Sequence, residues 1–300
     1  MLGLRHILHP LRSVKSVYSR ANRSLYSLLA RRQARDIRRG RRDRCWCGGE
    51  LLPFKWHPSY GVCACCESYV NRIPPSAEAL VQLYSLNSYW VVRQKAHGFP
   101  PIATRAELYL ADGRVEFWLK LVERYAPDKS RALEVGCAPG VLLAILRDRG
   151  LTCLGVEPSE ETAAWVRDRY GVDVRTGLFP EMDLPACDLF LAFDVLEHSS
   201  DPLRFMKGAS DLLSPGGVAI IQTAIDRYDY VPPFGDRFDG FDDVEHLFLF
   251  TDRAMSELAA RSHLDVVSLG ERLWLLGEVA IFRKPVMTAP GNSQFAQATT

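Results

Sequence analysis

Five of the eight cysteines lie between residues 45 and 66. They form a C-x-C pair and, after a gap of 15 residues, a C-x-x-C pair. Zinc takes four thiolate or imidazole ligands in tetrahedral geometry, and two cysteine pairs at about this separation supply them. Because the first pair is one residue shorter than usual, Cys65 and His57 are possible substitutes, and reduced cysteines without a metal are the alternative. The predicted ligands of one structural zinc ion, in a reducing compartment, are Cys45, Cys47, Cys63 and Cys66.

A second group of residues suits a ligand that contains a nucleoside. An apolar run ends in Glu134-Val-Gly136-Cys137-Ala-Pro-Gly140 and leads into a helical pattern. A tight turn against which a ligand lies needs small residues, and the two glycines meet that need. The next predicted strand ends at Glu157, whose carboxylate can accept hydrogen bonds from both ribose hydroxyls. A purely structural turn is the alternative.

Two histidines follow acidic residues, in Glu197-His198 and Glu245-His246. A side chain with a pKa near neutrality suits a general base, so we predict His246, or else His198, as the base for a hydroxyl acceptor. His246 is the first choice because it ends an aromatic and acidic stretch, residues 224–250, that could cover an acceptor. Packing or helix capping is the alternative role for each histidine, and a structural flap is the alternative for the stretch.

The elements that must position these residues alternate between strands and helices from residue 131 onward. This alternation predicts an α/β fold with a doubly wound, mostly parallel seven-stranded sheet, which binds ligands at the carboxyl ends of its strands. The predicted strands are 132–136, 154–157, 172–175, 189–193, 218–223, 264–269 and 273–282, with the last two joined by a turn at Gly270. The predicted helices are 77–84, 105–125, 141–149, 159–170, 201–213 and 251–261.

These residues resemble the class I S-adenosylmethionine-dependent methyltransferases over about residues 115–285. The glycine turn 134–140 is similar to the first motif of that family, and Glu157 to its ribose-binding acid. Asp194-Val-Leu-Glu197-His198 and Ser214-Pro-Gly-Gly217 match two further stretches of the family. The middle glycine of the family turn is Ala138 here, so a positive φ at that position is in doubt.

The resemblance implies a role for each matching residue. Glu134 would order the turn or meet the amino-acid end of S-adenosylmethionine, and Glu157 would hold its ribose. Segment 176–179 would flank the adenine, and Asp194 would face the methyl group and take part in catalysis. The implied cofactor-binding residues are Glu134, Gly136, Cys137, Gly140, Glu157, Gly177, Leu178 and Phe193. A nicotinamide dinucleotide is the rival ligand, but it would need G-x-G-x-x-G where this chain has G-x-x-x-G.

The cysteine module is also similar to the zinc-ribbon lead-in of bacterial methyltransferases that act on sugars of surface polysaccharides, glycolipids or natural products. C-methyltransferases of that group have a longer C-terminal extension, so the resemblance favours O-methylation of a sugar hydroxyl. The alternatives are methylation of a quinone or other small aromatic at a membrane, and a non-catalytic binding protein of the same fold.

Charge is distributed unevenly along the chain. Residues 1–44 hold 13 of the 37 basic residues and two of the 36 acidic ones, so this arm carries +11 and the rest −10. Apolar residues recur at helical spacing in the arm, which predicts a basic amphipathic helix on an anionic membrane surface. A solvated arm and a mitochondrial transit peptide are the alternatives. Nucleic acid is not expected as a substrate, because the acidic body would repel phosphates.

The sequence therefore predicts a cytoplasmic enzyme that can lie at a membrane surface, since no apolar run is long enough to span one. Its acceptor would be a small or lipid-linked sugar. The predicted organisation is a basic arm over residues 1–44, a zinc ribbon over 45–72, a helical linker over 73–130, a methyltransferase domain over 131–285 and a disordered tail over 286–300.

Overall fold

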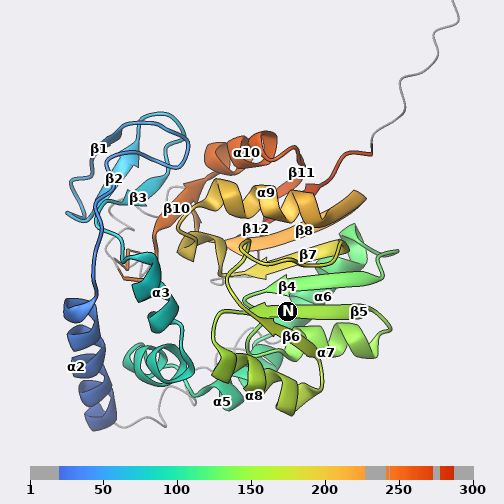
Figure 1. The fold of residues 1–300 in the computed structure, drawn as a ribbon, viewed down its shortest axis with the longest axis horizontal. Coiled ribbons are helices and arrows are strands. Elements are labelled where there is room, and N and C mark those ends of the chain that lie inside the picture. The colour runs from blue at the N-terminus through green and yellow to red at the C-terminus, as the bar shows by residue number, and fades with distance from the viewer. Residues whose placement is uncertain (1–19, 227–240, 243, 273–277, 287–300) are drawn as a thin grey trace, which may run out of the picture.

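The computed structural model describes residues 20–226, 241–242, 244–272 and 278–286. Most of them surround a seven-stranded sheet of order β11-β12-β8-β7-β4-β5-β6 (Figure 1). The five strands from β6 to β8 run parallel, while β12 is antiparallel to both of its neighbours. The strand bounds are β4 Arg131–Val135, β5 Thr152–Glu157, β6 Asp173–Thr176, β7 Cys187–Phe193, β8 Leu213–Thr223, β11 Asp265–Arg272 and β12 Glu278–Arg283. The predicted doubly wound fold is confirmed.

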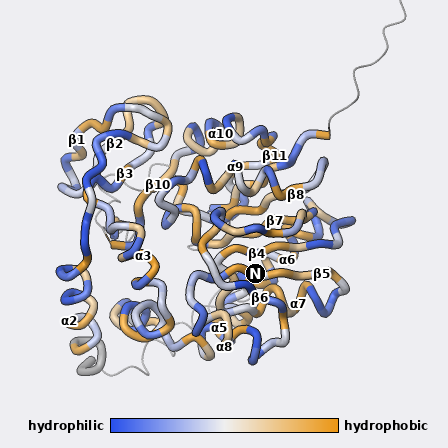
Figure 2. Tube along the Cα trace, viewed as in Figure 1, coloured by the Kyte–Doolittle hydropathy of each residue, from blue (hydrophilic) through white to orange (hydrophobic). Residues whose placement is uncertain are grey.

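The central strands are buried on both faces because helices cover both sides of the sheet. In β7, Leu189 and Leu191 pack in one apolar cluster, while Phe190 and Ala192 pack in the other. Figure 2 shows the same strands as a hydrophobic layer. One cluster includes side chains of α6 and α7, and the opposite one includes side chains of α9 and α10. These helices are α6 Arg114–Tyr125, α7 Val141–Asp148, α8 Glu160–Tyr170, α9 Pro202–Leu212 and α10 Asp252–Arg261.

Two sequence-based boundaries were wrong. The single helix predicted over residues 105–125 is two helices, α5 Ile102–Ala111 and α6, because Gly113 between them adopts a left-handed φ of +83°. Gly270 is not a hairpin turn but lies inside β11 with φ +91°, where the pairing register with β12 shifts by a bulge. A residue with φ in this region is most easily glycine, which explains both positions.

A smaller five-stranded sheet contains the cysteine module. Its order is β1-β2-β3-β10-β9, so strands from the N-terminal module pair with strands from the segment after β8. Val70 of β3 pairs with Phe248 of β10, and both side chains are buried. The strand bounds are β1 Leu51–Pro53, β2 Tyr60–Cys63, β3 Tyr69–Asn71, β9 Ile225–Asp226 and β10 Phe248–Thr251.

The remaining helices are α2, Arg20–Asp36, which precedes both sheets, and the helices between β3 of the small sheet and β4 of the large one. Helix α3, Ala77–Leu83, was predicted over residues 77–84, and Ser76 caps it by accepting a hydrogen bond from the Ala79 N–H (3.3 Å). A π-helical segment η1, Leu86–Arg93, and a short α4, Gln94–Ala96, follow, and α2 packs against both. Within the described residues, no helix is long and apolar enough to cross a membrane. Residues 1–19 of the predicted arm lie outside the described part.

Candidate active site

The turn between β4 and α7 has two positions, Gly136 and Gly140, at which no side chain fits. Gly136 and Gly140 have φ values of +68° and +88°. A Cβ added at Gly136 would lie 2.5 Å from Val195 Cγ2, and one at Gly140 would lie 2.4 Å from Val166 Cγ1. Glycine is therefore required at both positions. Ala138 is not among the residues with positive φ, so alanine fits where the related turn has glycine.

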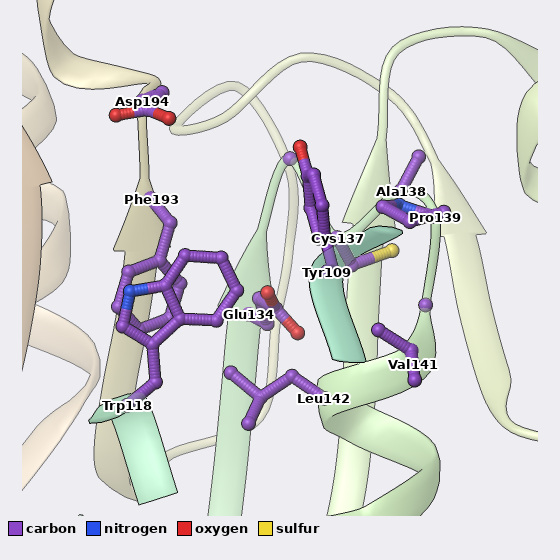
Figure 3. A pocket seen from close by; sticks show the side chains of 12 residues that line it. Tyr109, Trp118, Glu134, Cys137, Ala138, Pro139, Val141, Leu142, Phe193 and Asp194 are labelled. Carbon is purple, nitrogen blue, oxygen red and sulfur yellow. The ribbon is translucent and has the colours of Figure 1, made fainter. Parts of the chain in front are cut away.

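A pocket opens at this turn, at the carboxyl end of the sheet (Figure 3). Its lining includes Glu134, Gly136, Cys137, Gly140, Phe193 and Asp194, all predicted site residues, together with Tyr109 and Trp118. The Glu134 side chain is buried, and its Oε2 has no hydrogen-bond partner in the described part of the chain. Burial raises the pKa of this carboxyl well above its usual range. A buried, unpaired carboxyl at a pocket wall suits a positively charged ligand group such as an ammonium.

Glu157 lies at the end of β5, the strand next to β4. Its side chain is 5% exposed. Burial raises its pKa to about 8, although the backbone N–H groups of Ser159 and Ala138 favour the charged form. Gly177, predicted to flank adenine, donates its N–H to the Glu157 carbonyl (3.0 Å), while Leu178 is exposed. These three residues do not line the pocket of Figure 3.

Asp194 is held in an unusual backbone conformation at the mouth of the pocket. Its φ is +55°, uncommon for a residue other than glycine, and residues in such conformations cluster at functional sites. The Gln222 side chain donates from Nε2 to Asp194 Oδ1 (2.8 Å) and accepts from Trp118 Nε1 (2.9 Å). The Trp118 ring stacks on Phe193, with centroids 4.2 Å apart. Trp118 and Gln222 thus position Asp194.

The two predicted base candidates lie together just beyond Asp194. Their ring centroids are 5.0 Å apart. His198 Nδ1 lies 2.7 Å from the Glu245 carbonyl oxygen. A carbonyl can only accept, so Nδ1 is the donor, and in the neutral form of the ring Nε2 carries the lone pair. Glu197 is buried and accepts a hydrogen bond from Thr223 Oγ1 (2.7 Å). Burial and the charge of Asp194 raise the pKa of Glu197 to about 7.

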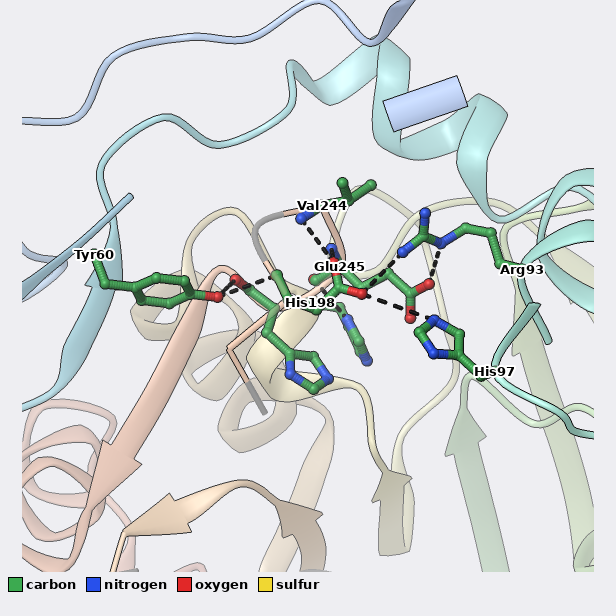
Figure 4. Close-up of polar contacts among 8 residues, drawn as sticks. Tyr60, Arg93, His97, His198, Val244 and Glu245 are labelled. Atoms are coloured by element: carbon green, nitrogen blue, oxygen red, sulfur yellow. Dashed lines mark hydrogen bonds and ion pairs between the residues drawn. The ribbon is translucent and has the colours of Figure 1, made fainter. Parts of the chain in front are cut away.

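The segment that carries His246 is fixed from both sides (Figure 4). On one side, the Tyr60 hydroxyl of β2 donates to the His246 carbonyl oxygen (2.7 Å). On the other, the buried Arg93 guanidinium pairs with Glu245 and with Asp242, 2.9 Å from Oδ2. Sequence reasoning missed Arg93, because a basic residue among apolar ones in a helical stretch gives no signal of a partner about 150 residues away. In the aromatic and acidic stretch 224–250, the described Phe241 packs on Tyr60. The aromatic residues Tyr228, Tyr230, Phe234 and Phe238 of this stretch lie outside the described residues.

Two further buried side chains, Tyr84 and Arg105, have polar atoms without a hydrogen-bond partner in the described part of the chain. The Tyr84 hydroxyl is buried without a hydrogen bond, and its ring lies 5.6 Å from that of His198. Arg105 is 8% exposed, and its Nε and Nη1 have no hydrogen-bond acceptor. Its guanidinium packs on the rings of Phe99 (3.9 Å) and of Tyr109 (5.4 Å), a pocket residue. An unpaired buried guanidinium calls for an anionic ligand group.

The four predicted zinc ligands converge at the edge of the small sheet. Cys45 Sγ lies 3.5 Å from Cys66 Sγ and Cys47 Sγ 3.4 Å from Cys63 Sγ, and all four sulfurs lie within 4.8 Å of one another. Tetrahedral Zn–S bonds of about 2.3 Å place sulfurs about 3.8 Å apart, so the cluster fits this ion. The N–H groups of Gly49 and Cys65 point at Cys47 Sγ and Cys63 Sγ (both 3.4 Å). Neither Cys65 nor His57 belongs to this four-sulfur group.

Comparisons with known proteins agree with this geometry. A family model described as a methyltransferase domain matches residues 108–269, more than half of the chain. A probable S-adenosylmethionine-dependent methyltransferase of Mycolicibacterium smegmatis is 36% identical over 94 residues, 30% of this chain and 37% of that protein. A ubiquinone biosynthesis O-methyltransferase of Bradyrhizobium diazoefficiens is 30% identical over 99 residues, 31% of this chain and 39% of that protein. The similarity thus spans less than half the length of these relatives.

Among solved structures, that of Streptomyces venezuelae DesVI has a TM-score of 0.51 at 15% identity and covers 62% of this chain and 97% of its own. This likeness supports the Rossmann-like fold. The glycine turn, the two buried acids at neighbouring strand ends and the family match lead to one conclusion. The chain belongs to the methyltransferase-domain family.

Proposed function

We propose that the protein is an S-adenosylmethionine-dependent methyltransferase, and that it methylates a hydroxyl oxygen of a sugar, either free or lipid-linked. The observation that carries the proposal is the polar character of the region beside Asp194. The buried Tyr84 hydroxyl lies beside His198, and Arg105 packs on Tyr109 of the pocket wall; the hydroxyls and an acidic group of a sugar acceptor would supply the partners that these polar atoms lack among the described residues. The resemblance of the cysteine module to that of sugar methyltransferases supports the same acceptor class.

The cofactor would lie between the glycine turn and the end of β5. Glu134 would receive its ammonium group, and Glu157 would accept hydrogen bonds from both ribose hydroxyls. Gly177 and Leu178 would flank the adenine. The remaining residues that would contact it are Gly136, Cys137, Gly140 and Phe193. When bound, S-adenosylmethionine supplies an electrophilic methyl group whose bond to sulfur breaks with its electron pair staying on sulfur.

The protein's own task is to align the acceptor and take its proton. Asp194, fixed by Gln222, would face the methyl group and orient the attacking hydroxyl. A sugar hydroxyl is not ionised at neutral pH, so its proton must leave as the new carbon–oxygen bond forms. His198 or His246 would accept that proton. His198 is suitably oriented, because its Nδ1–H is held by the Glu245 carbonyl and Nε2 can accept.

The decisive experiment is a screen of acceptors with a labelled methyl donor. Sugars, sugar nucleotides and lipid-linked sugars would form one arm, and quinols and small phenols the other. We expect label in the first arm, with the site of the new methyl ether located by mass spectrometry. Label confined to phenols would refute the sugar proposal.

Methylation of a quinone precursor is the second candidate. Its support is the similarity to ubiquinone biosynthesis O-methyltransferases, which is limited to about a third of this chain. A flat aromatic acceptor offers fewer polar groups than a sugar to meet the Tyr84 hydroxyl and the Arg105 guanidinium, which is why we rank it second. The third alternative, a non-catalytic binding protein of the same fold, would match the same family model and would transfer label to neither arm of the screen.

The cysteine cluster is proposed to hold one structural zinc ion. Four protein ligands leave no open position for water or substrate, so the ion would stabilise the small sheet and take no part in the reaction. The Thr251 hydroxyl, which caps α10, donates to the Cys66 carbonyl (2.8 Å), and Arg261 of α10 donates to the Cys47 carbonyl (3.2 Å). Zinc would therefore also fix the docking of the ribbon on the catalytic half.

The basic arm is proposed to bring the enzyme to an anionic membrane surface. The described part of the arm supports this, because Leu25, Leu28 and Leu29 of α2 are 55%, 64% and 39% exposed. Their spacing places them on one helix face, close to arginines that would meet lipid phosphates. This placement suits a cytoplasmic enzyme with a lipid-linked acceptor.

A further inference from the structure

Three side chains with metal-binding atoms lie together beyond Asp194, in the region where we propose that the acceptor binds. One carboxylate oxygen of Glu197 and one ring nitrogen each of His198 and His246 all lie within 4.8 Å of one another. Glu197 and His198 belong to the short helix η2, Leu196–His198, which follows β7, while His246 precedes β10. The Leu247 N–H donates to the Glu197 carbonyl (2.8 Å) and ties the two segments together. The cluster is thus assembled by the fold from residues almost 50 positions apart.

The surroundings of the cluster have the features of a metal site. A histidine that binds a metal almost always donates its other ring N–H to a carbonyl or carboxylate, and ligating carboxylates are themselves hydrogen-bonded. His198 donates from Nδ1 to the Glu245 carbonyl (2.7 Å), and Glu197 Oε2 accepts from Thr223 (2.7 Å). Both interactions orient the ligands and leave the opposite atom of each group available.

The charge balance points the same way. Glu197 is 3% exposed, and no lysine or arginine in the described part of the chain forms an ion pair with it. A bound cation would stabilise the charged form of this buried carboxyl group. Asp194, three residues earlier, adds a second acid close by.

A neighbouring cluster, His97, Asp242 and Glu245, has similar potential ligands, but its carboxylates already have a positively charged partner. Arg93 pairs with both of its carboxylates, so these charges are already neutralised by a guanidinium. The same argument that favours a cation at Glu197 excludes one here. The two clusters therefore form a matched pair for an experiment.

We propose that Glu197, His198 and His246 bind one divalent transition-metal ion, such as Mn²⁺, Fe²⁺, Co²⁺ or Zn²⁺, with open positions that face the acceptor. Two imidazoles and one carboxylate are typical ligands of these ions, whereas Mg²⁺ and Ca²⁺ prefer oxygen ligands throughout. Three protein ligands leave room for a substrate oxygen, in contrast to the closed four-cysteine site.

The role of the ion rests on the proposed oxygen methylation. The acceptor hydroxyl oxygen would coordinate to the ion, which lowers the pKa of that hydroxyl. Its proton would pass to a water molecule, and the oxygen would then attack the methyl carbon as the carbon–sulfur bond breaks toward sulfur. In this form of the reaction, the histidines are ligands and no side chain needs to act as the base.

Binding is tested without any acceptor, by titrating the zinc-loaded full-length protein with Mn²⁺, followed by electron paramagnetic resonance, and with Co²⁺, followed by visible absorption. Zinc left in the cysteine site keeps that site closed to both probes. We expect one bound ion per chain. Because even an outer-shell change costs about 10–100-fold in affinity, His198→Ala, His246→Ala and Glu197→Gln should each weaken binding by more than about 100-fold.

His97→Ala is the matched control and should bind Mn²⁺ and Co²⁺ as the wild type does. Unchanged adenosylhomocysteine affinity would show that each variant is folded. The proposal is overturned if neither ion binds, or if His97→Ala abolishes binding while His198→Ala does not. Once an acceptor is known, turnover can be measured before and after the bound ion is removed. Unchanged turnover without the ion would overturn its catalytic role. If no hydroxyl acceptor is methylated, the proposed function is refuted, but the evidence for the ion site is unaffected.

Discussion

Glu157 offers the sharpest test of the cofactor site, because its replacement should change binding and stability in opposite directions. Glu157→Ala removes the acceptor of both ribose hydroxyls. The two ribose hydroxyls favour the ionised carboxylate in the complex, and hydrogen bonds to a charged group contribute about 1.5–3 kcal/mol, so we expect the Kd for adenosylhomocysteine to rise about 10- to 150-fold. Isothermal titration calorimetry measures this directly.

The isosteric change Glu157→Gln should stabilise the protein without ligand. Burial raises the pKa of Glu157 from 4.5 to about 8, so the folded state prefers the protonated form. The stability associated with this proton is complete below the unfolded pKa and is lost as the pH rises toward 8. With about 1.4 kcal/mol per pKa unit, the accumulated cost is about 3 kcal/mol at pH 7. The amide of the glutamine variant would never be charged and would escape most of this cost.

Denaturant unfolding of both proteins between pH 5 and pH 8 measures the effect. The free energy of unfolding of Glu157→Gln should exceed that of the wild type by about 1–3 kcal/mol at pH 7, and the difference should shrink as the pH falls toward 4.5. Unchanged cofactor affinity in Glu157→Ala would remove the central assignment of the site. A Glu157→Gln protein that is less stable than the wild type at pH 7 would refute the burial argument.

Four further predictions concern the remaining features. Metal analysis of freshly purified, reduced protein should find one zinc in the cysteine site per chain, and Cys47→Ser should lose it; a wild type without zinc would contradict the assignment. His198→Ala and His246→Ala should each lower turnover about 10²–10⁴-fold and keep adenosylhomocysteine affinity, whether the ring acts as base or ligand, and near-wild-type turnover of both would eliminate them. Arg105→Met should raise the KM for an acidic acceptor if Arg105 contacts the acceptor, or the Kd of the cofactor if Arg105 contacts the cofactor carboxylate. No change in either constant would show that Arg105 has a packing role only. Removal of residues 1–44 should abolish sedimentation with anionic vesicles, and equal binding of truncated and full-length protein would show that the arm is not the anchor.

The large sheet could be predicted from the sequence because its information is local. Two helices that follow strands of the sheet begin at the side-chain caps Ser159 and Asp201, and the central strands are short, mainly apolar segments. The glycine turn and Glu157 could likewise be placed, since parallel strands bring their carboxyl ends to one edge. The bulge at Gly270 could not, because a glycine inside a strand and a glycine in a hairpin turn leave the same mark in a sequence.

The polar contacts around the acceptor region could not be predicted, because they join distant parts of the chain. Trp118 and Gln222 are 104 positions apart and each is consistent with simple core packing. The pairing of Arg93 with Glu245 spans 152 positions. The sequence indicated the two histidines by their type, but their proximity depends on how the segment before β10 folds back against η2.

The hydrogen-bonded edge between β3 and β10 has a consequence for how this protein can change during evolution. Val70 and Phe248, and Tyr69 and Leu249, are register partners whose backbones complete one sheet, so the cysteine module is not an independent appendage. A gene fusion or deletion that removed the module would leave β10 with unpaired N–H and C=O groups and expose Phe248 and Leu249, which are now at most 1% exposed. Inheritance of the module and of the segment before β10 should therefore be coupled, with substitutions on the two strands correlated among relatives. Exchange of one without the other would disturb the segment that carries His246.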